Sequence, residues 1–123
     1  MKIEVSNAEI LDKLTILEIK LKFIFDESKK QDIKKEYEYL LNIAQHIDGF
    51  SIDLLTDLAV VNQEIWRIED SIREKERKKK FDKEFIELAR SVYFKNDERA
   101  RIKKEINLQT KSNFVEQKSY EKY

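Results

Sequence analysis

Apolar side chains recur along most of this chain at alternating steps of three and four residues, which is the spacing of one face of an α-helix. The pattern predicts four helices joined by short polar turns. Their expected ranges are about 7–25, 32–47, 51–79 and 82–109. Ser6 and Glu9 have the S-x-x-E spacing of a capping box at the start of the first helix. We therefore predict an all-α antiparallel bundle of two shorter and two long helices, forming one domain over residues 1–123.

The two ends of the chain lie outside this helical pattern. The opening "KIEV" alternates polar and apolar residues, which predicts a short extended arm that turns Ile3 and Val5 inward. The tail after the fourth helix is polar, but it keeps apolar and aromatic side chains, so we expect part of it to dock on the bundle. These side chains are Phe114, Val115, Tyr120 and Tyr123.

The first helix is apolar on two sides. One seam consists of Ile10, Leu14, Leu17, Leu21 and Ile24, and a second set, on roughly the opposite side, consists of Ile16, Ile19 and Phe23. A helix with two apolar faces is sandwiched between neighbours. Because one neighbour can be another subunit, and because the long helix pair should overhang the short pair, we predict a homodimer.

Polar side chains interrupt the apolar face of the third helix in the stretch "NQEIWRIEDSIRE". At about 100° per residue, Asn62, Glu69 and Arg73 fall on the same side as Trp66 and the isoleucines. Asp70 points outward. This helix therefore turns an amide, a carboxylate and a guanidinium toward its neighbours.

The fourth helix repeats this arrangement, because its inward face is apolar in the first half and polar in the second. The polar half contains Asn96, Arg99 and Lys103. Folding the two long helices antiparallel brings Asn62 level with Arg99, and Trp66 level with Asn96. The two polar sets should therefore meet in one layer.

Glu18 joins this layer from the first helix, where it projects within an apolar face. The candidate binding residues of the polar layer are Glu18, Asn62, Trp66, Glu69, Arg73, Asn96, Arg99 and Lys103. One interpretation is a self-satisfied network that fixes helix register, since a buried charge is tolerated only when it is paired. The other is a pocket that holds a small anionic or sugar-like ligand beside the tryptophan. Lys103 gives the layer a surplus positive charge, which favours a ligand.

The overall charge narrows the classes of partner. The 25 basic and 25 acidic side chains cancel, so no net field steers the chain toward nucleic acid or an anionic membrane, and we expect neither as a partner. The basic run Arg73–Lys80 is explained by the preference of cations for a helix C-terminus. The chain has no cysteine, no apolar run of the roughly 20 residues that span a membrane and no signal-peptide core near its start. We therefore expect a cytoplasmic location.

Catalytic groups are scarce in the sequence. The only histidine, His46, projects away from its helix seam, which leaves no histidine-based triad or metal site. Glu84 and Glu87 fall on the outward side of the fourth helix, away from any carboxylate partner. We expect no catalytic residue, no metal site and no cofactor. Enzymatic activity stays open, but a non-enzymatic role is favoured.

Several stretches resemble a family of small bacterial and phage-associated proteins known as a domain of unknown function. The stretches are "VSNAEILDKLTILEIKLKFI", "VNQEIWRIEDSIREKE", "FDKEFIELARSVYFKNDERARIKKEIN" and "EQKSY", in order over nearly the whole chain. The family's opening carries glycine after V-S-N, where this chain has Ala8. The resemblance implies a cytoplasmic helical protein, sometimes found beside surface-polysaccharide or glycosyltransferase functions, and supplies no catalytic residue.

Two functions remain open from the sequence. The favoured one is a non-enzymatic oligomeric assembly or adaptor module whose polar layer sets helix register. The alternative is a binding protein or enzyme for a small anionic or sugar-containing ligand, held by arginine and asparagine side chains inside the bundle.

Overall fold

A computed structural model of the protein describes residues 3–112 and confirms the all-α prediction. It contains the helices α1 (Asn7–Phe23), α2 (Glu27–Ala44), α3 (Ile52–Arg77) and α4 (Lys83–Gln109), and no strand occurs within the described residues. Each helix begins with a side-chain cap, from Ser6, Asp26, Ser51 and Asp82 respectively. These caps accept hydrogen bonds from backbone N–H groups that have no partner within the helix.

The largest difference from the predicted boundaries is at the start of α2. In the stretch "DESKKQ", expected to be a turn, Asp26 instead caps α2 and the next five residues are helical. This helix therefore begins at Glu27 rather than near residue 32. Asp26 determines this start, because its carboxylate accepts a hydrogen bond of 3.1 Å from the backbone N–H of Lys29. The first helix ends at Phe23 rather than Phe25.

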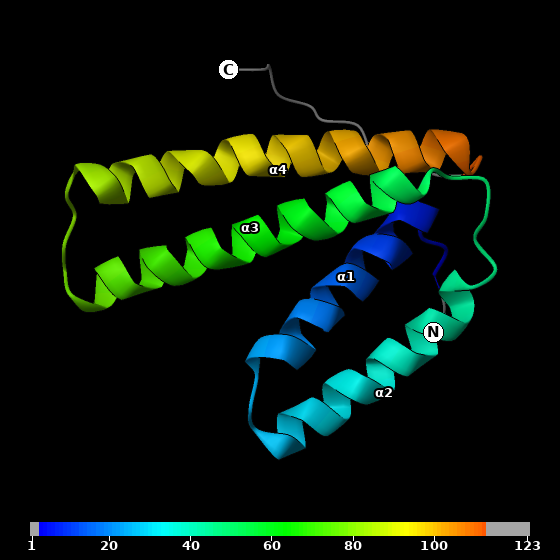
Figure 1. Ribbon diagram of the computed structural model, residues 1–123, viewed down its shortest axis with the longest axis horizontal. Helices are drawn as coiled ribbons and strands as arrows, with labels where there is room; N and C mark the ends of the chain where they lie inside the picture. The colour runs from blue at the N-terminus through cyan, green and yellow to red at the C-terminus, as the bar shows by residue number, and fades with distance from the viewer. Residues whose placement is uncertain (1–2, 113–123) are drawn as a thin grey trace.

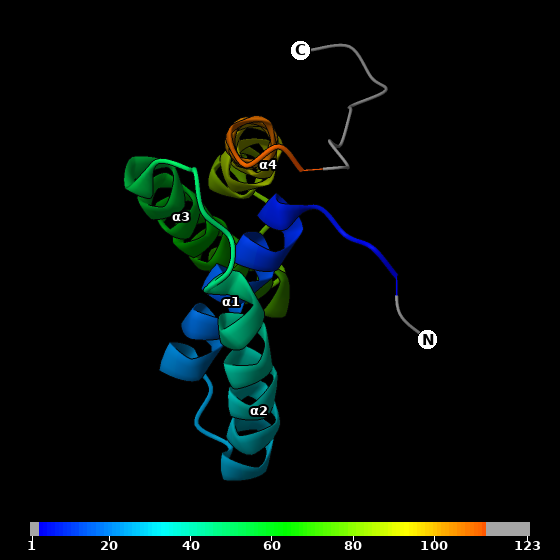
Figure 2. The ribbon, with the colours of Figure 1, turned by 90° about the vertical axis from the view of Figure 1, so that its right-hand side faces the viewer.

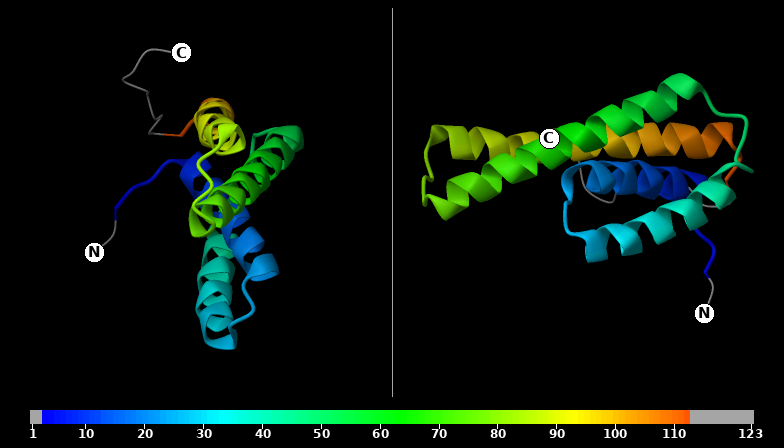
Figure 3. Two further views of the ribbon diagram at one scale, coloured as in Figure 1. Left: turned by 90° about the vertical axis from the view of Figure 1, so that its left-hand side faces the viewer. Right: turned by 60° about the horizontal axis from the view of Figure 1, so that its bottom comes forward.

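The four helices are stacked in three tiers. Helices α3 and α4 form a long antiparallel hairpin, α1 packs against both of them, and α2 packs on α1 (Figures 1 and 2). The α3–α4 hairpin extends well beyond the end of the shorter α1–α2 pair (Figure 1 and Figure 3, right). Only the inner half of the hairpin therefore has a third helix on it.

Both apolar faces of α1 are covered within the chain. One faces α2, whose partly buried Leu40 and Leu41 pack against the core. Beside them Lys13 pairs with Glu36 at 2.8 Å, and the Tyr37 hydroxyl donates to Glu18 at 3.0 Å. The other rests on α3 and α4. The core cluster spans both contacts of α1, and its fully or nearly buried apolar side chains are Ala8, Leu11, Leu14, Ala44, Leu58, Val61, Ile65, Ile102 and Ile106. The two apolar faces of α1 therefore do not require a second subunit.

The N-terminal arm is extended, but it does not tuck its apolar side chains inward. Ile3 is 77% exposed and Val5 is 44% exposed, so the prediction that they turn inward is wrong. The alternation of polar and apolar residues in this arm predicts an extended conformation, but it does not identify a surface against which Ile3 and Val5 could pack. The predicted docking of Phe114, Val115, Tyr120 and Tyr123 lies outside the described residues. Within residues 3–112, none of the helices is both long and apolar enough to cross a membrane.

Candidate functional site

A buried carboxylate, Asp12 of α1, lies where α1 crosses the hairpin. Only 3% of the residue is exposed. Its Oδ1 accepts hydrogen bonds of 2.9 Å from Asn62 Nδ2 of α3 and 2.9 Å from Arg99 Nε of α4. Its Oδ2 accepts from the Arg99 Nη2, which completes a two-pronged contact. Asp12 therefore links three helices, and its oxygens are occupied by donors.

Three further side chains, Glu9, Thr15 and Lys103, complete this arrangement. We call it the Asp12 cluster: Glu9, Asp12, Thr15, Asn62, Arg99 and Lys103. Asn62 Nδ2 also donates to Thr15 Oγ1 at 2.8 Å, and that hydroxyl donates to the backbone oxygen of Asp12 at 2.7 Å. Lys103 Nζ lies 3.5 Å from Asp12 Oδ2 and pairs with Glu9. Two carboxylates face two cations, so the charge surplus expected from Lys103 is cancelled.

The end of α4 fixes the start of α1 beside this cluster. The side-chain oxygen of Asn107 accepts a hydrogen bond of 2.9 Å from the backbone N–H of Ala8, and Ser112 accepts one of 3.1 Å from the N–H of Asn7. Ala8 is fully buried, so only a small side chain fits here. These contacts hold α1 at one height along the hairpin, which places Asp12 opposite Arg99.

The surroundings of Asp12 stabilise its charged form. Burial acts to raise the pKa of the Asp12 carboxyl, but hydrogen bonds from Arg99 and Asn62 and the positive charges of Lys103 and Arg99 act against it. The net result is a pKa below the ordinary value of 3.8.

This shift predicts a pH dependence of stability. Because the pKa of Asp12 is lower in the folded than in the unfolded chain, its stabilising contribution is present above about pH 4 and is lost as the pH falls through the folded pKa. Urea unfolding at about pH 5 and about pH 3 should show a larger loss of stability for the native chain than for Asp12→Asn. The other carboxyls with lowered pKa, Glu74 and Asp82, are present in both proteins. Equal losses in both proteins would contradict the assignment.

Three of the residues predicted for the polar layer lie in the Asp12 cluster: Asn62, Arg99 and Lys103. Trp66 lies beside it along α3, with its ring stacked on that of Phe23 of α1 at 6.0 Å between centroids. The Trp66 Nε1 atom is buried, and no acceptor for it occurs among the described residues. A buried donor without an acceptor costs stability, typically about 1–3 kcal/mol.

The other predicted members lie apart from the cluster. Glu18 is exposed and bonded to Tyr37 in the α1–α2 contact, because its position faces α2 rather than the hairpin. Arg73 is also exposed, with 65% of its side chain accessible and Asp70 at 3.8 Å. Glu69 and Asn96 are half-buried on the hairpin. Arg73 lies beyond the end of α1, so the prediction that it is enclosed with Arg99 is wrong.

Sequence reasoning missed the central residue, Asp12, and its neighbour Thr15. The signal was present, because Asp12 precedes Ile16 by four residues and continues the second apolar set of α1. Extending that set by one turn would have placed a carboxylate on the face that meets the hairpin. The exposed position of His46, by contrast, agrees with the prediction.

The rest of the described chain offers few groups for chemistry. Within residues 3–112, no cluster of three or more histidine, aspartate or glutamate side chains could hold a metal ion. The Asp12 carboxylate is surrounded by donors that already use its oxygens.

The model of a family of unknown function (DUF6165) matches residues 1–123. No protein of curated function and no solved structure matches the chain.

Proposed function

Because this chain belongs to a family of unknown function (DUF6165), we propose a function from its own contacts: a non-enzymatic assembly module. In this proposal, two copies pair through the outer half of the α3–α4 hairpin. The lack of cysteine supports a reducing compartment such as the cytoplasm.

The observation that carries the proposal is the incomplete core of the outer hairpin. Fully or nearly buried apolar residues on α3 end at Ile65, and on α4 they begin at Ile102. Beyond them, the inward apolar positions are only half-buried: Ile68, Ile72, Phe85, Leu88, Ala89 and Val92. Two helices alone form a single layer, and an apolar layer is stable when a second layer covers it. The outer half therefore has the properties of a surface that a partner covers.

The face in question continues the face that α1 already covers. Asn62, Trp66, Glu69 and Arg73 follow one another at steps of four, three and four, so they form one stripe along α3. Asn62 contacts Asp12, and Trp66 contacts Phe23. Glu69 and Arg73 lie further along the same stripe, past these contacts. A helix from a partner would meet them as α1 meets Asn62.

The charges on this stripe favour a second copy of the chain as the partner. Glu69 and Arg73 are one turn apart on α3 and have opposite charge. In a twofold dimer with antiparallel α3 helices, Glu69 of each chain would lie opposite Arg73 of the other. The stripe is therefore complementary to itself. The Asp12 cluster supports this arrangement, because it holds α1 on the inner half and leaves the outer half uncovered.

Light scattering coupled to size-exclusion chromatography tests the proposal. At protein concentrations of tens of micromolar, we expect twice the mass of one chain, falling toward one chain on dilution. Replacing Ile72 by lysine places a charge in the half-buried face and should shift the protein to the monomer, whereas Lys34→Ala on the exposed side of α2 should not. A monomer at all concentrations would remove the proposal.

A second candidate function rests on the buried indole N–H of Trp66, which has no acceptor among residues 3–112. An oxygen of a small anionic or sugar-containing ligand would satisfy it, with Glu69 one turn further along the same face of α3. Under this alternative, a ligand should raise the thermal unfolding midpoint of the native chain but not of Trp66→Phe, which keeps an aromatic ring and loses the indole N–H. An equal rise in both proteins would count against a ligand at this position.

A further inference from the structure

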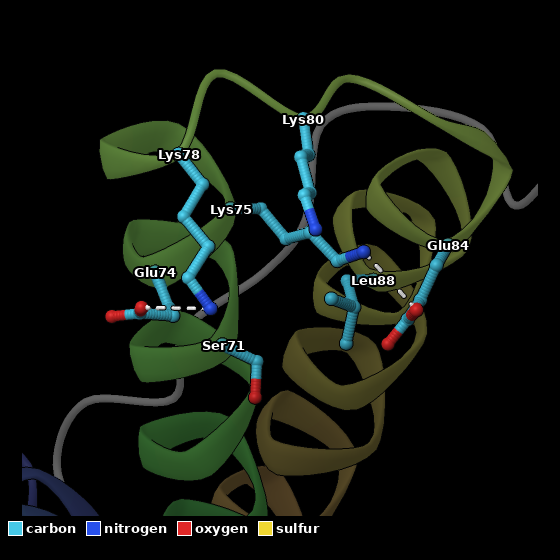
Figure 4. A pocket seen from close by; sticks show the side chains of 7 residues that line it. All are labelled: Ser71, Glu74, Lys75, Lys78, Lys80, Glu84 and Leu88. Atoms are coloured by element: carbon cyan, nitrogen blue, oxygen red, sulfur yellow. Dashed lines mark hydrogen bonds and ion pairs between the residues drawn. The ribbon is translucent and has the colours of Figure 1, made fainter.

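The tip of the hairpin contains a surface hollow on the side opposite to the Glu69–Arg73 stripe. It lies between the last turns of α3 and the first turns of α4 and has a volume of about 230 Å³. Its lining residues are Ser71, Glu74, Lys75, Lys78, Lys80, Glu84 and Leu88 (Figure 4). Ser71 is two positions from Glu69, which turns it about 200° around α3. The hollow is therefore separate from the dimer surface.

We propose that this hollow binds a phosphate-type oxyanion, held by the ammonium group of Lys80 with Lys78 and the Ser71 hydroxyl. The inference is independent of the dimer, because the two surfaces face opposite ways.

The ion pairs around the hollow leave one cation over. Lys75, only 16% exposed, bridges to Asp82 at 3.0 Å and to Glu84 at 3.1 Å. Glu74 accepts from Arg77 at 3.1 Å and lies 3.3 Å from the Lys78 ammonium. With Lys80 added, the group contains four cations and three carboxylates. The cations are Lys75, Arg77, Lys78 and Lys80, and the carboxylates are Glu74, Asp82 and Glu84. No carboxylate within residues 3–112 pairs with Lys80, so the surplus positive charge is its own.

The Lys80 side chain points into the hollow, so its positive charge is available to a bound anion. In Figure 4 its side chain reaches from the segment between α3 and α4 down into the space between the helices, rather than away from them. Lys79, at φ 52°, adopts the left-handed conformation that turns the backbone here. Two of the lining carboxylates already have cations, so they repel an incoming anion less than free carboxylates would.

The size and chemistry of the hollow indicate the class of ligand. Pockets for drug-sized molecules have volumes of roughly 300–1,000 Å³, so this hollow fits one small group. Ammonium groups bind phosphate as point charges, and a hydroxyl donates to a phosphate oxygen. The ligand is therefore free phosphate or a phosphate monoester group carried on a larger molecule, such as a lipid headgroup.

Titration of the full-length chain with inorganic phosphate, followed by two-dimensional NMR at constant ionic strength, tests the proposal. We expect the backbone amide signals of Ser71 and Lys80 to shift in a saturable way. Lys80→Gln should weaken phosphate binding by about tenfold. Lys83→Gln is the matched control, because Lys83 is a neighbouring, 89% exposed cation outside the lining, and it should weaken binding less than twofold, roughly.

Vesicles of phosphatidylcholine with and without phosphatidic acid distinguish the two sources. Binding to phosphatidic acid vesicles that is lost in Lys80→Gln and kept in Lys83→Gln supports the site with a lipid as the source. Binding of free phosphate that is weakened in Lys80→Gln and kept in Lys83→Gln, without binding to phosphatidic acid vesicles, supports the site with a soluble ligand. No saturable binding of either probe, or equal weakening by both substitutions, overturns the proposal, since equal weakening indicates only diffuse attraction to the basic tip.

Discussion

Replacing Asp12 by alanine is expected to lower the free energy of unfolding by about 3 kcal/mol or more. Removing one partner of a buried ion pair typically costs about 3–5 kcal/mol, because the other charge stays buried without compensation. Here the remaining charges are those of Arg99 and Lys103, and both lose the Asp12 carboxylate that they contact. Arg99 retains 28% side-chain exposure and can regain some water, so we expect the lower end of that range. Urea unfolding followed by circular dichroism measures the change at fixed protein concentration.

The control for this prediction is an exposed pair on the same helix. Lys13 and Glu36 are separated by 2.8 Å, but both are largely exposed, so Glu36→Ala should cost at most about 1 kcal/mol. The double variant Asp12→Leu with Arg99→Leu should recover much of the loss, since apolar replacement of a buried pair is often neutral or stabilising. If Asp12→Ala destabilises no more than Glu36→Ala, Asp12 does not hold α1 on the hairpin.

The sequence predicts the helices well because their signals are local. Apolar spacing and capping side chains act within a few residues, so they predict all four helices. The one large boundary difference arises because Asp26 caps α2 before its apolar pattern begins. The prediction that α1 is enclosed between neighbouring elements agrees with its contacts to α2, α3 and α4. Which neighbours enclose it was not predictable, because apolar side chains on two faces fit a second subunit as well as α2 and the hairpin.

The candidate site was harder to predict. A helical pattern gives the side of the helix on which a residue lies, but not how far a neighbouring helix extends along that side. Asn62, Trp66, Glu69 and Arg73 do share one side of α3, as their spacing requires. Only the first two meet α1, because the Ala8–Asn107 contact sets its height and α1 ends at Phe23. The stripe is therefore divided by tertiary structure into an inner part that contacts α1 and an outer part. That division is the reason for assigning the outer part to a partner.

Reversing the charges of this outer part should test the dimer and its geometry together. In the proposed twofold arrangement, Glu69→Arg places two arginines opposite each other at two symmetric positions, and Arg73→Glu does the same with two glutamates. Each single substitution should weaken the dimer on the order of a hundredfold, because both symmetric pairs become repulsive. The double variant restores opposite charges in the reversed order, so its dissociation constant should return to within about tenfold of the native value. Analytical ultracentrifugation measures all three.

Asp57 supplies the matched control for the charge reversal. It lies on the same helix as Glu69, but it is exposed and turned about 120° away from the stripe, so Asp57→Arg makes the same change of charge outside the proposed contact. We expect a dimer of near-native affinity. Rescue by the double variant, with no effect of Asp57→Arg, would require that Glu69 and Arg73 face each other across the interface. Weakening by both single substitutions without rescue would instead mean that the outer hairpin binds its partner in another register, because loss of both charges would then add rather than cancel.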